Sequence, residues 1–158
     1  MADLRSLCET MGWRDVKSYI QSGNLIFDSD KASASLEHML QKVLLEKYGF
    51  EVPVIVRSLE ELQIAATKNP FLNKDMDINR LHLTLLQSRP SADKVERTRT
   101  YHYEPDRFHI DDKEVFIYCE GKYHLSKLTN SFFEKKLNVA ATTRNWKTVM
   151  KLLALASE

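Results

Sequence analysis

The chain has 158 residues, a length that suits one domain of ordinary size or two small subdomains that share a core. Hydrophobic residues make up 43% of the chain and charged residues 28%, close to globular averages, and only 4 Gly and 4 Pro argue against a disordered or linker-rich chain. The formal net charge of +1 indicates no class of partner, although the 7 basic and 2 acidic side chains of residues 121–158 favour an anionic one.

The first half of the sequence predicts the order αββαβ followed by a helix. The helices show apolar residues at helical spacing, and the strands are short runs of β-branched and aromatic residues. Gly23 lies between two β-rich runs and indicates a hairpin; a single strand with a bulge at Gly23 is the alternative. The expected elements are a helix at residues 2–11, strands at 16–21 and 25–27, a helix at 34–48, a strand at 52–56 and a helix at 58–67.

The second half has a similar pattern but no clear closing strand. The polar residues 111–113 separate two β-rich runs and predict a second hairpin. Thr142 or Thr143 is expected to cap the last helix, whose apolar face includes Trp146 and Val149. The expected elements are a strand at residues 81–86, a helix at 92–100, strands at 107–110 and 115–119, a helix at 128–137 and a last helix through residue 156.

These elements indicate an α+β fold of two ferredoxin-like (split βαβ) subdomains. With one strand added in front, the first half would read βαββαβ, which is the split βαβ pattern. The second half reads βαββαα and repeats most of that pattern. We therefore expect an N-terminal subdomain at residues 1–75, which lacks its initial strand, and a C-terminal α+β subdomain at residues 76–158, joined in one compact unit.

Four sequence strings occur in order along nearly the whole chain: Tyr19-Ile20-Gln21-Ser22-Gly23-Asn24, Val56-Arg57-Ser58, Asn69-Pro70-Phe71 and Thr143-Arg144-Asn145-Trp146-Lys147-Thr148. The first and the last strings are the most specific. Together the four strings resemble a bacterial family of unknown function, number 1697 in the domain-of-unknown-function series. The resemblance implies an α+β fold with ferredoxin-like character, and it implies no established activity.

The chain departs from this family at its start. Members of the family usually begin with a strand and a glycine-rich turn that read roughly Leu-Arg-Gly-Ile-Asn-Val-Gly-Gly. That segment precedes the one that here begins Met-Ala-Asp-Leu-Arg. The resemblance therefore implies that Met1 is an internal methionine of a longer chain, or that the chain is a truncated relic.

The string from Thr143 to Lys147 is the first candidate site. The start of a helix offers free backbone N–H groups and a partial positive charge, and Arg144 adds a planar fork that suits phosphate or carboxylate. We assign Thr143, Arg144, Asn145 and Lys147 to ligand binding, with Lys147 on the same side of the helix as Arg144. The alternative is a capped amphipathic helix with a core Trp146 and exposed basic residues.

The residues around the predicted hairpin turn form the second candidate site. Its members are Tyr19, Gln21, Ser22, Asn24 and Arg57. Gln and Asn amides at a hairpin tip suit bases, sugars or amides, and Arg57 ends a strand that is expected in the same sheet. The alternative is local turn chemistry, because Asn24 tolerates a left-handed backbone and short polar side chains bond to nearby backbone groups.

Residue types that bind metals or attack substrates form no recognisable motif. Six metal-ligand types lie close together, but their spacing fits no known module: His102, Glu104, Asp106, His109, Asp111 and Asp112. The glycines are scattered, without a Walker A loop or a dinucleotide fingerprint, and we expect neither a metal nor a cofactor. Cys8 and Cys119 form no Cys-x-x-Cys pair, and the absence of a catalytic motif leaves the enzyme question open while leaning against it.

The residues therefore favour a binding function. We expect a soluble cytoplasmic protein, because isolated cysteines fit a reducing compartment and no run approaches the roughly 20 apolar residues that span a bilayer. We expect it to bind an anionic ligand, either nucleic acid or a phosphorylated or carboxylated metabolite, through Arg144 and the helix N-terminus. The alternatives are a small enzyme acting on a polar metabolite and a non-catalytic interaction or dimerisation protein, as a monomer or a homodimer.

Overall fold

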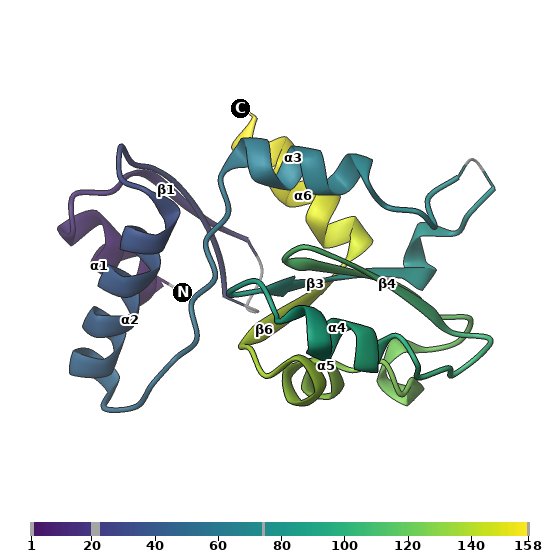
Figure 1. Ribbon diagram of the computed structural model, residues 1–158. Coiled ribbons are helices and arrows are strands. Elements are labelled where there is room, and N and C mark those ends of the chain that lie inside the picture. The colour runs from purple at the N-terminus through teal and green to yellow at the C-terminus, as the bar shows by residue number, and fades with distance from the viewer. Residues whose placement is uncertain (1, 20–22, 74, 158) are drawn as a thin grey trace. The chain divides into compact units, whose positions relative to one another are not determined.

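The computed structural model describes residues 2–19, 23–73 and 75–157 (Figure 1). In this described part, the chain is an α+β protein with six α-helices and two antiparallel sheets. The chain divides into two compact units, residues 1–59 with 150–158 (unit 1) and residues 60–149 (unit 2). The boundary that we expected between residues 75 and 76 falls within unit 2. None of the helices in the described ranges is both long and apolar enough to cross a bilayer.

Unit 1 begins with a helix, a hairpin and a second helix. These elements are α1 (Ala2–Thr10), β1 (Arg14–Tyr19), β2 (Asn24–Asp28) and α2 (Ser33–Tyr48). β1 and β2 pair in antiparallel fashion with Tyr19 opposite Asn24, which confirms the predicted hairpin. Gly23 has a φ of 84°, a left-handed conformation that favours glycine, and so it suits the turn.

The core of unit 1 is formed by the apolar faces of its helices. Three leucines spaced four residues apart on α2 are buried: Leu36, Leu40 and Leu44. Cys8 of α1 and Trp13 complete this cluster. Trp13 stacks on Phe27 of β2 with the ring centroids 4.1 Å apart, so the hairpin packs against the same core as the helices.

Residues 52–56, which were predicted as a strand, form no regular strand within the described part of the chain. Val52, Val54 and Val56 nevertheless pack against the core of unit 1, as their spacing predicts. The N–H of Val56 donates to Oε1 of Glu37 on α2 at 2.8 Å, so this amide is bound by a side chain. The prediction was wrong because alternating β-branched residues indicate a half-buried extended segment. They do not specify the regular backbone pairing that defines a strand.

Unit 2 is built on a four-stranded antiparallel sheet with the strand order β4-β5-β3-β6. Its elements are α3 (Leu59–Thr67), η1 (Ile78–Arg80), β3 (Leu81–Leu86), α4 (Ala92–Thr98), β4 (Arg107–Asp111), β5 (Glu114–Tyr118), η2 (Tyr123–Leu125), α5 (Asn130–Leu137), β6 (Ala141–Asn145) and the first turn of α6 (Trp146–Ala156). The β4–β5 pair confirms the second predicted hairpin. Figure 1 shows α4 and α5 on one face of this sheet and α3 with the start of α6 on the other.

Side chains from both faces of this sheet are buried. On the face that α4 and α5 cover, Ile110, Val115 and Ile117 pack in one cluster with Phe133 and Leu137 of α5. Strands β3 and β5 are the interior strands of the sheet, and most of their residues are buried. The sheet thus holds β6, and the motif residues that it carries, against a rigid central strand.

The sequence analysis placed the start of the last helix too early, at a cap formed by Thr142 or Thr143. Residues 141–145 form the closing strand β6 that we did not predict, and α6 begins only at Trp146. Thr142 and Thr143 pair with Leu85 and Thr84 of β3. A threonine suits a helix cap and a strand equally well in isolation, and here pairing with the buried central strand decides between them.

Candidate functional site

Thr143 faces the side of the sheet that carries α5, and its hydroxyl joins two elements. Its Oγ1 lies 2.6 Å from Oγ1 of Thr84 and donates to Oδ1 of Asn130 on α5 at 2.9 Å. Because the single hydroxyl proton of Thr143 goes to Asn130, Thr84 is the donor to Thr143. The amide of Asn130 in turn donates to the carbonyl of Ala141 at 3.0 Å. Thr143 therefore has a structural role that accounts for its place in the motif.

Arg144 lies on the opposite face of β6, because neighbouring strand residues alternate. Its side chain is half-buried, and Nη1 donates to Oγ1 of Thr142 at 2.7 Å and to the carbonyl of Thr143 at 3.0 Å. Burial lowers the pKa of the Arg144 guanidinium, although arginine remains charged at neutral pH. The arrangement holds a partly desolvated positive charge in a defined position.

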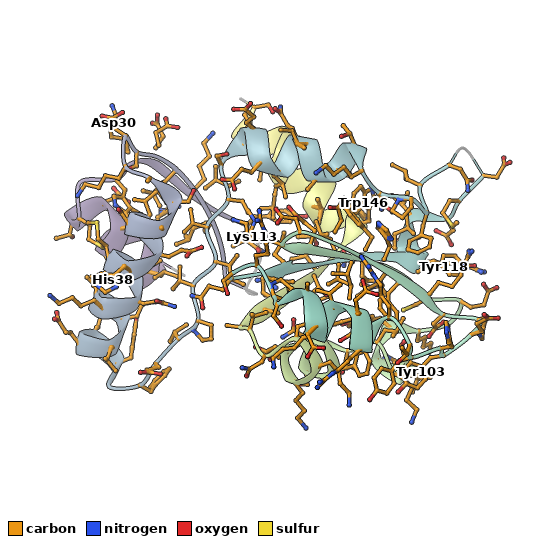
Figure 2. The ribbon with its side chains drawn as sticks, in the orientation of Figure 1. Asp30, His38, Tyr103, Lys113, Tyr118 and Trp146 are labelled. Atoms are coloured by element: carbon orange, nitrogen blue, oxygen red, sulfur yellow. The ribbon has the colours of Figure 1, made fainter. Side chains whose placement is uncertain are left out.

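Asn145 and Lys147 have different surroundings at the start of α6. Oδ1 of Asn145 accepts a hydrogen bond from the N–H of Thr148 at 2.8 Å, so Asn145 caps the helix. Lys147 is exposed in the first turn. Trp146 between them is buried beside the sheet, where Figure 2 shows its side chain at the start of α6. The N–H of Thr148 is therefore already hydrogen-bonded, although we had expected the N–H groups at this helix start to be available to a ligand.

The second candidate site belongs to unit 1, whereas the first belongs to unit 2. Gln21 and Ser22 lie outside the described residues. Asn24 is buried, and its amide donates to the carbonyl of Tyr19 at 3.1 Å across the hairpin. Arg57 is half-buried and donates from Nη1 to the carbonyl of Val56 at 3.3 Å. The contact of Asn24 is the local turn chemistry that we gave as the alternative.

A pair of stacked rings beside Thr143 was missed by the sequence analysis. His82 of β3 is only 8% exposed and stacks on Tyr123 with ring centroids 4.3 Å apart. Burial lowers the pKa of His82 and raises the pKa of the Tyr123 phenol. The sequence did contain a pattern that could have identified His82. His82 and Thr84 alternate with leucines in β3, which places two polar groups on one face of an otherwise apolar strand.

The structure gives no support for a metal site or a cysteine nucleophile among the residues considered for these roles. No group of three His, Cys, Asp or Glu side chains with metal-binding geometry occurs in the described ranges. Oδ1 of Asp106 accepts from the N–H of Glu120 at 2.9 Å, and Oδ2 accepts from the hydroxyl of Ser126 at 2.7 Å. Both cysteines are buried, and burial raises the pKa of the Cys8 thiol to about 11, which keeps it protonated and unreactive at neutral pH.

One comparison with known proteins identifies a family, and another identifies a similar fold. The family described as "Protein of unknown function (DUF1697)" matches residues 1–116, and the string from Thr143 to Thr148 lies beyond this match. A solved structure of a conserved bacterial protein from Streptococcus pneumoniae is similar to the whole of this chain and to 89% of its own, with 22% identity and a TM-score of 0.79. No curated protein matches the chain.

Proposed function

This chain belongs to the DUF1697 family of proteins of unknown function, and we propose that it binds an anionic ligand through Arg144. The observation that carries this proposal is the half-buried guanidinium, which Thr142 and Thr143 hold in one orientation. Burial disfavours the charged form, and an anion placed beside the guanidinium offsets that cost. The planar fork of arginine matches the two oxygens of a phosphate or a carboxylate.

The first turn of α6 supports the same class of ligand. Lys147 is exposed there, and the N-terminal end of a helix carries a partial positive charge. Asn145 acts as the helix cap in this proposal and does not contact the ligand. The ligand is a phosphorylated or carboxylated metabolite or a nucleic acid, and the test below separates these sources.

The test compares the wild-type chain with Arg144→Gln. Thermal shifts with inorganic phosphate and with citrate report small anions, and the anisotropy of a labelled mixed-sequence oligonucleotide reports nucleic acid. We expect Arg144→Gln to weaken binding about ten- to one-hundredfold, as for the loss of a charged hydrogen bond. For the oligonucleotide, the logarithm of the affinity should fall linearly with the logarithm of the salt concentration.

A matched control is available on α6, the helix that follows Arg144 in the chain. Lys151 is exposed on α6, and Lys151→Gln removes one positive charge without touching the contacts of Arg144. Equal losses for the two variants would indicate a general effect of charge and would remove the specific role of Arg144. An unchanged affinity of Arg144→Gln for every probe would reject the site.

We propose further that the two units are ferredoxin-like. For unit 2, the support is the element order β3-α4-β4-β5-α5-β6 together with the antiparallel strand order β4-β5-β3-β6, which match a split βαβ pattern. For unit 1, α1, β1, β2, α2 and the extended residues 52–56 follow the order of that pattern after its first strand. Solving an experimental structure of each unit would test this assignment.

We also propose a cytoplasmic location. Cys8 and Cys119 are both free thiols, which suits a reducing compartment. Fractionation of cells that express the tagged chain, followed by detection of the tag in each fraction, tests this proposal.

A further inference from the structure

A cavity of about 340 Å³ lies beside β4, one of the two edge strands of the sheet in unit 2. Its lining combines aromatic rings and arginines: Phe71, Tyr101, Tyr103, Phe108, Arg99 and Arg107. The volume is within the range of small-molecule sites, about 300–1,000 Å³. We propose that this cavity binds a small molecule with a planar aromatic ring and one anionic group, at a site separate from Arg144.

The aromatic side of the cavity is held in place by packing. The rings of Tyr101 and Tyr103 are nearly parallel, with an interplanar angle of 18° and centroids 6.3 Å apart. Each of these rings is nearly perpendicular to the ring of Phe132, with centroids 5.6 Å and 5.7 Å apart. Because these rings are already ordered, a planar ligand stacks on them at a small entropic cost. Nζ of Lys136 lies 4.6 Å from the centroid of the Tyr101 ring and adds a positive charge nearby.

Arg107 supplies the group that recognises the anion. Its guanidinium carbon lies 5.3 Å from the ring centroid of Phe71 and 5.0 Å from that of Tyr118. Figure 2 shows Tyr118 and Tyr103 toward the same end of the sheet in unit 2. Aromatic rings bind the face of a guanidinium, whereas its N–H donors lie in the plane and suit a carboxylate or phosphate. Within residues 2–19, 23–73 and 75–157, the side chain of Arg107 makes no hydrogen bond or ion pair.

The neighbouring charged groups have partners of their own. Arg99 pairs with Glu96, with Nη1 2.6 Å from Oε1. Glu120, whose charge interacts with Arg107, lies closer to Arg80, with Oε1 2.7 Å from Nη1. Arg107 is therefore the cation in the lining whose donors an incoming anion can occupy.

The carboxylates of the lining limit the charge of the ligand. Asp106 already accepts hydrogen bonds from Glu120 and Ser126 through its two oxygens. Glu104 is exposed at the cavity and repels additional negative charge. A ligand with a single carboxylate or phosphate monoester fits this balance, and a polyphosphate does not. The Glu104 oxygens also offer acceptors for N–H groups on the aromatic ring.

The experiment uses calorimetric titration of the whole chain with four probes. Adenosine monophosphate and indole-3-acetate have a ring and an anion, whereas adenosine and inorganic phosphate each have one of these groups. We expect at least one ringed anion to bind more tightly than both single-feature probes. Which of the two binds distinguishes a nucleotide from an aromatic carboxylate.

Variants then assign the binding to this cavity. Arg107→Gln should weaken binding of the ringed anion about tenfold, as for a lost charged hydrogen bond. Arg97→Gln, at an exposed position of α4 outside the cavity, should leave binding unchanged. Tyr101→Leu should weaken binding and Tyr101→Phe should retain it, and circular dichroism of each variant reports whether it is folded.

Three results would overturn the inference. They are the failure of both ringed anions to bind at millimolar concentration, equal binding by folded Arg107→Gln and the wild type, and binding of adenosine or inorganic phosphate as tight as that of the better-bound ringed anion. A loss in Arg144→Gln without a loss in Arg107→Gln would reject this cavity while supporting the site at Arg144. The reverse pattern would support the cavity alone.

Discussion

Thr84 and Thr143 share a hydrogen bond of 2.6 Å between their Oγ1 atoms, across β3 and β6 of unit 2. Because side chains alternate along a strand, this contact turns Thr143 toward α5 and leaves Arg144 on the opposite face of the sheet. Thr143, which has a structural role, and Arg144, which we propose contacts a ligand, therefore lie on opposite faces of the sheet.

The hydroxyl network can be tested with Thr143→Val, which keeps the shape of the side chain. We expect the free energy of unfolding to fall by about 1–3 kcal/mol, because the fully buried hydroxyl of Thr84 loses its acceptor. Urea denaturation measures this change. Thr67→Val, at an exposed position of α3, is the matched control and should stay within about 0.5 kcal/mol of wild type. Equal losses in the two variants would contradict the role of the network.

The helix cap can be tested with Asn145→Ala. Loss of the acceptor for the N–H of Thr148 should lower the free energy of unfolding by about 1 kcal/mol, as for other N-caps. Asn145→Asp retains an acceptor and places a negative charge near the positive end of α6, so it should preserve stability. Thermal unfolding of the two variants side by side is the measurement. If Ala and Asp prove equally stable, Asn145 is not the cap.

The contact that binds residue 56 can be tested by amide hydrogen exchange. Glu37→Ala removes the acceptor of the Val56 N–H, and exchange at this amide should become about fivefold faster, since the lost bond is worth about 1 kcal/mol. Glu46→Ala, at an exposed position of the same helix, should leave the exchange rate unchanged. An unaltered rate in Glu37→Ala would mean that a different group protects this amide.

His82 should make stability depend on pH. Burial lowers the pKa of His82 in the folded chain below the ordinary value of 6.5, so the unfolded chain binds the proton more readily. The stabilisation from neutral His82 is complete above about pH 6.5 and is lost as the pH falls toward the lowered pKa.

The variant His82→Phe keeps an aromatic ring against Tyr123 and removes the titrating group. Free energies of unfolding measured from about pH 7.5 to pH 5 should then fall less steeply than those of wild type. Parallel curves for the two proteins would show that His82 does not cause the loss.

Part of the candidate site was predictable because its residues have a recognisable local chemistry. Arg144 was assigned to anion binding from its type and from its expected place in the first turn of a helix, and this assignment remains a proposal. The capping contact of Asn145 was not predicted, because a cap depends on where the helix begins. The cavity beside β4 was not predicted, since it brings Phe71 next to residues 99–109 and only the folded chain makes that contact.

The elements whose hydrogen bonds are local could be predicted from the order of the residues alone. The spacing of Leu36, Leu40 and Leu44 predicts α2, and the polar residues 111–113 predict the turn between β4 and β5. The strand at residues 141–145 could be recognised only in the folded chain, because its pairing partners are residues 82–86, which are distant in the sequence. The bonds of an α-helix join residues four positions apart, whereas those of a strand depend on a partner that no local pattern specifies.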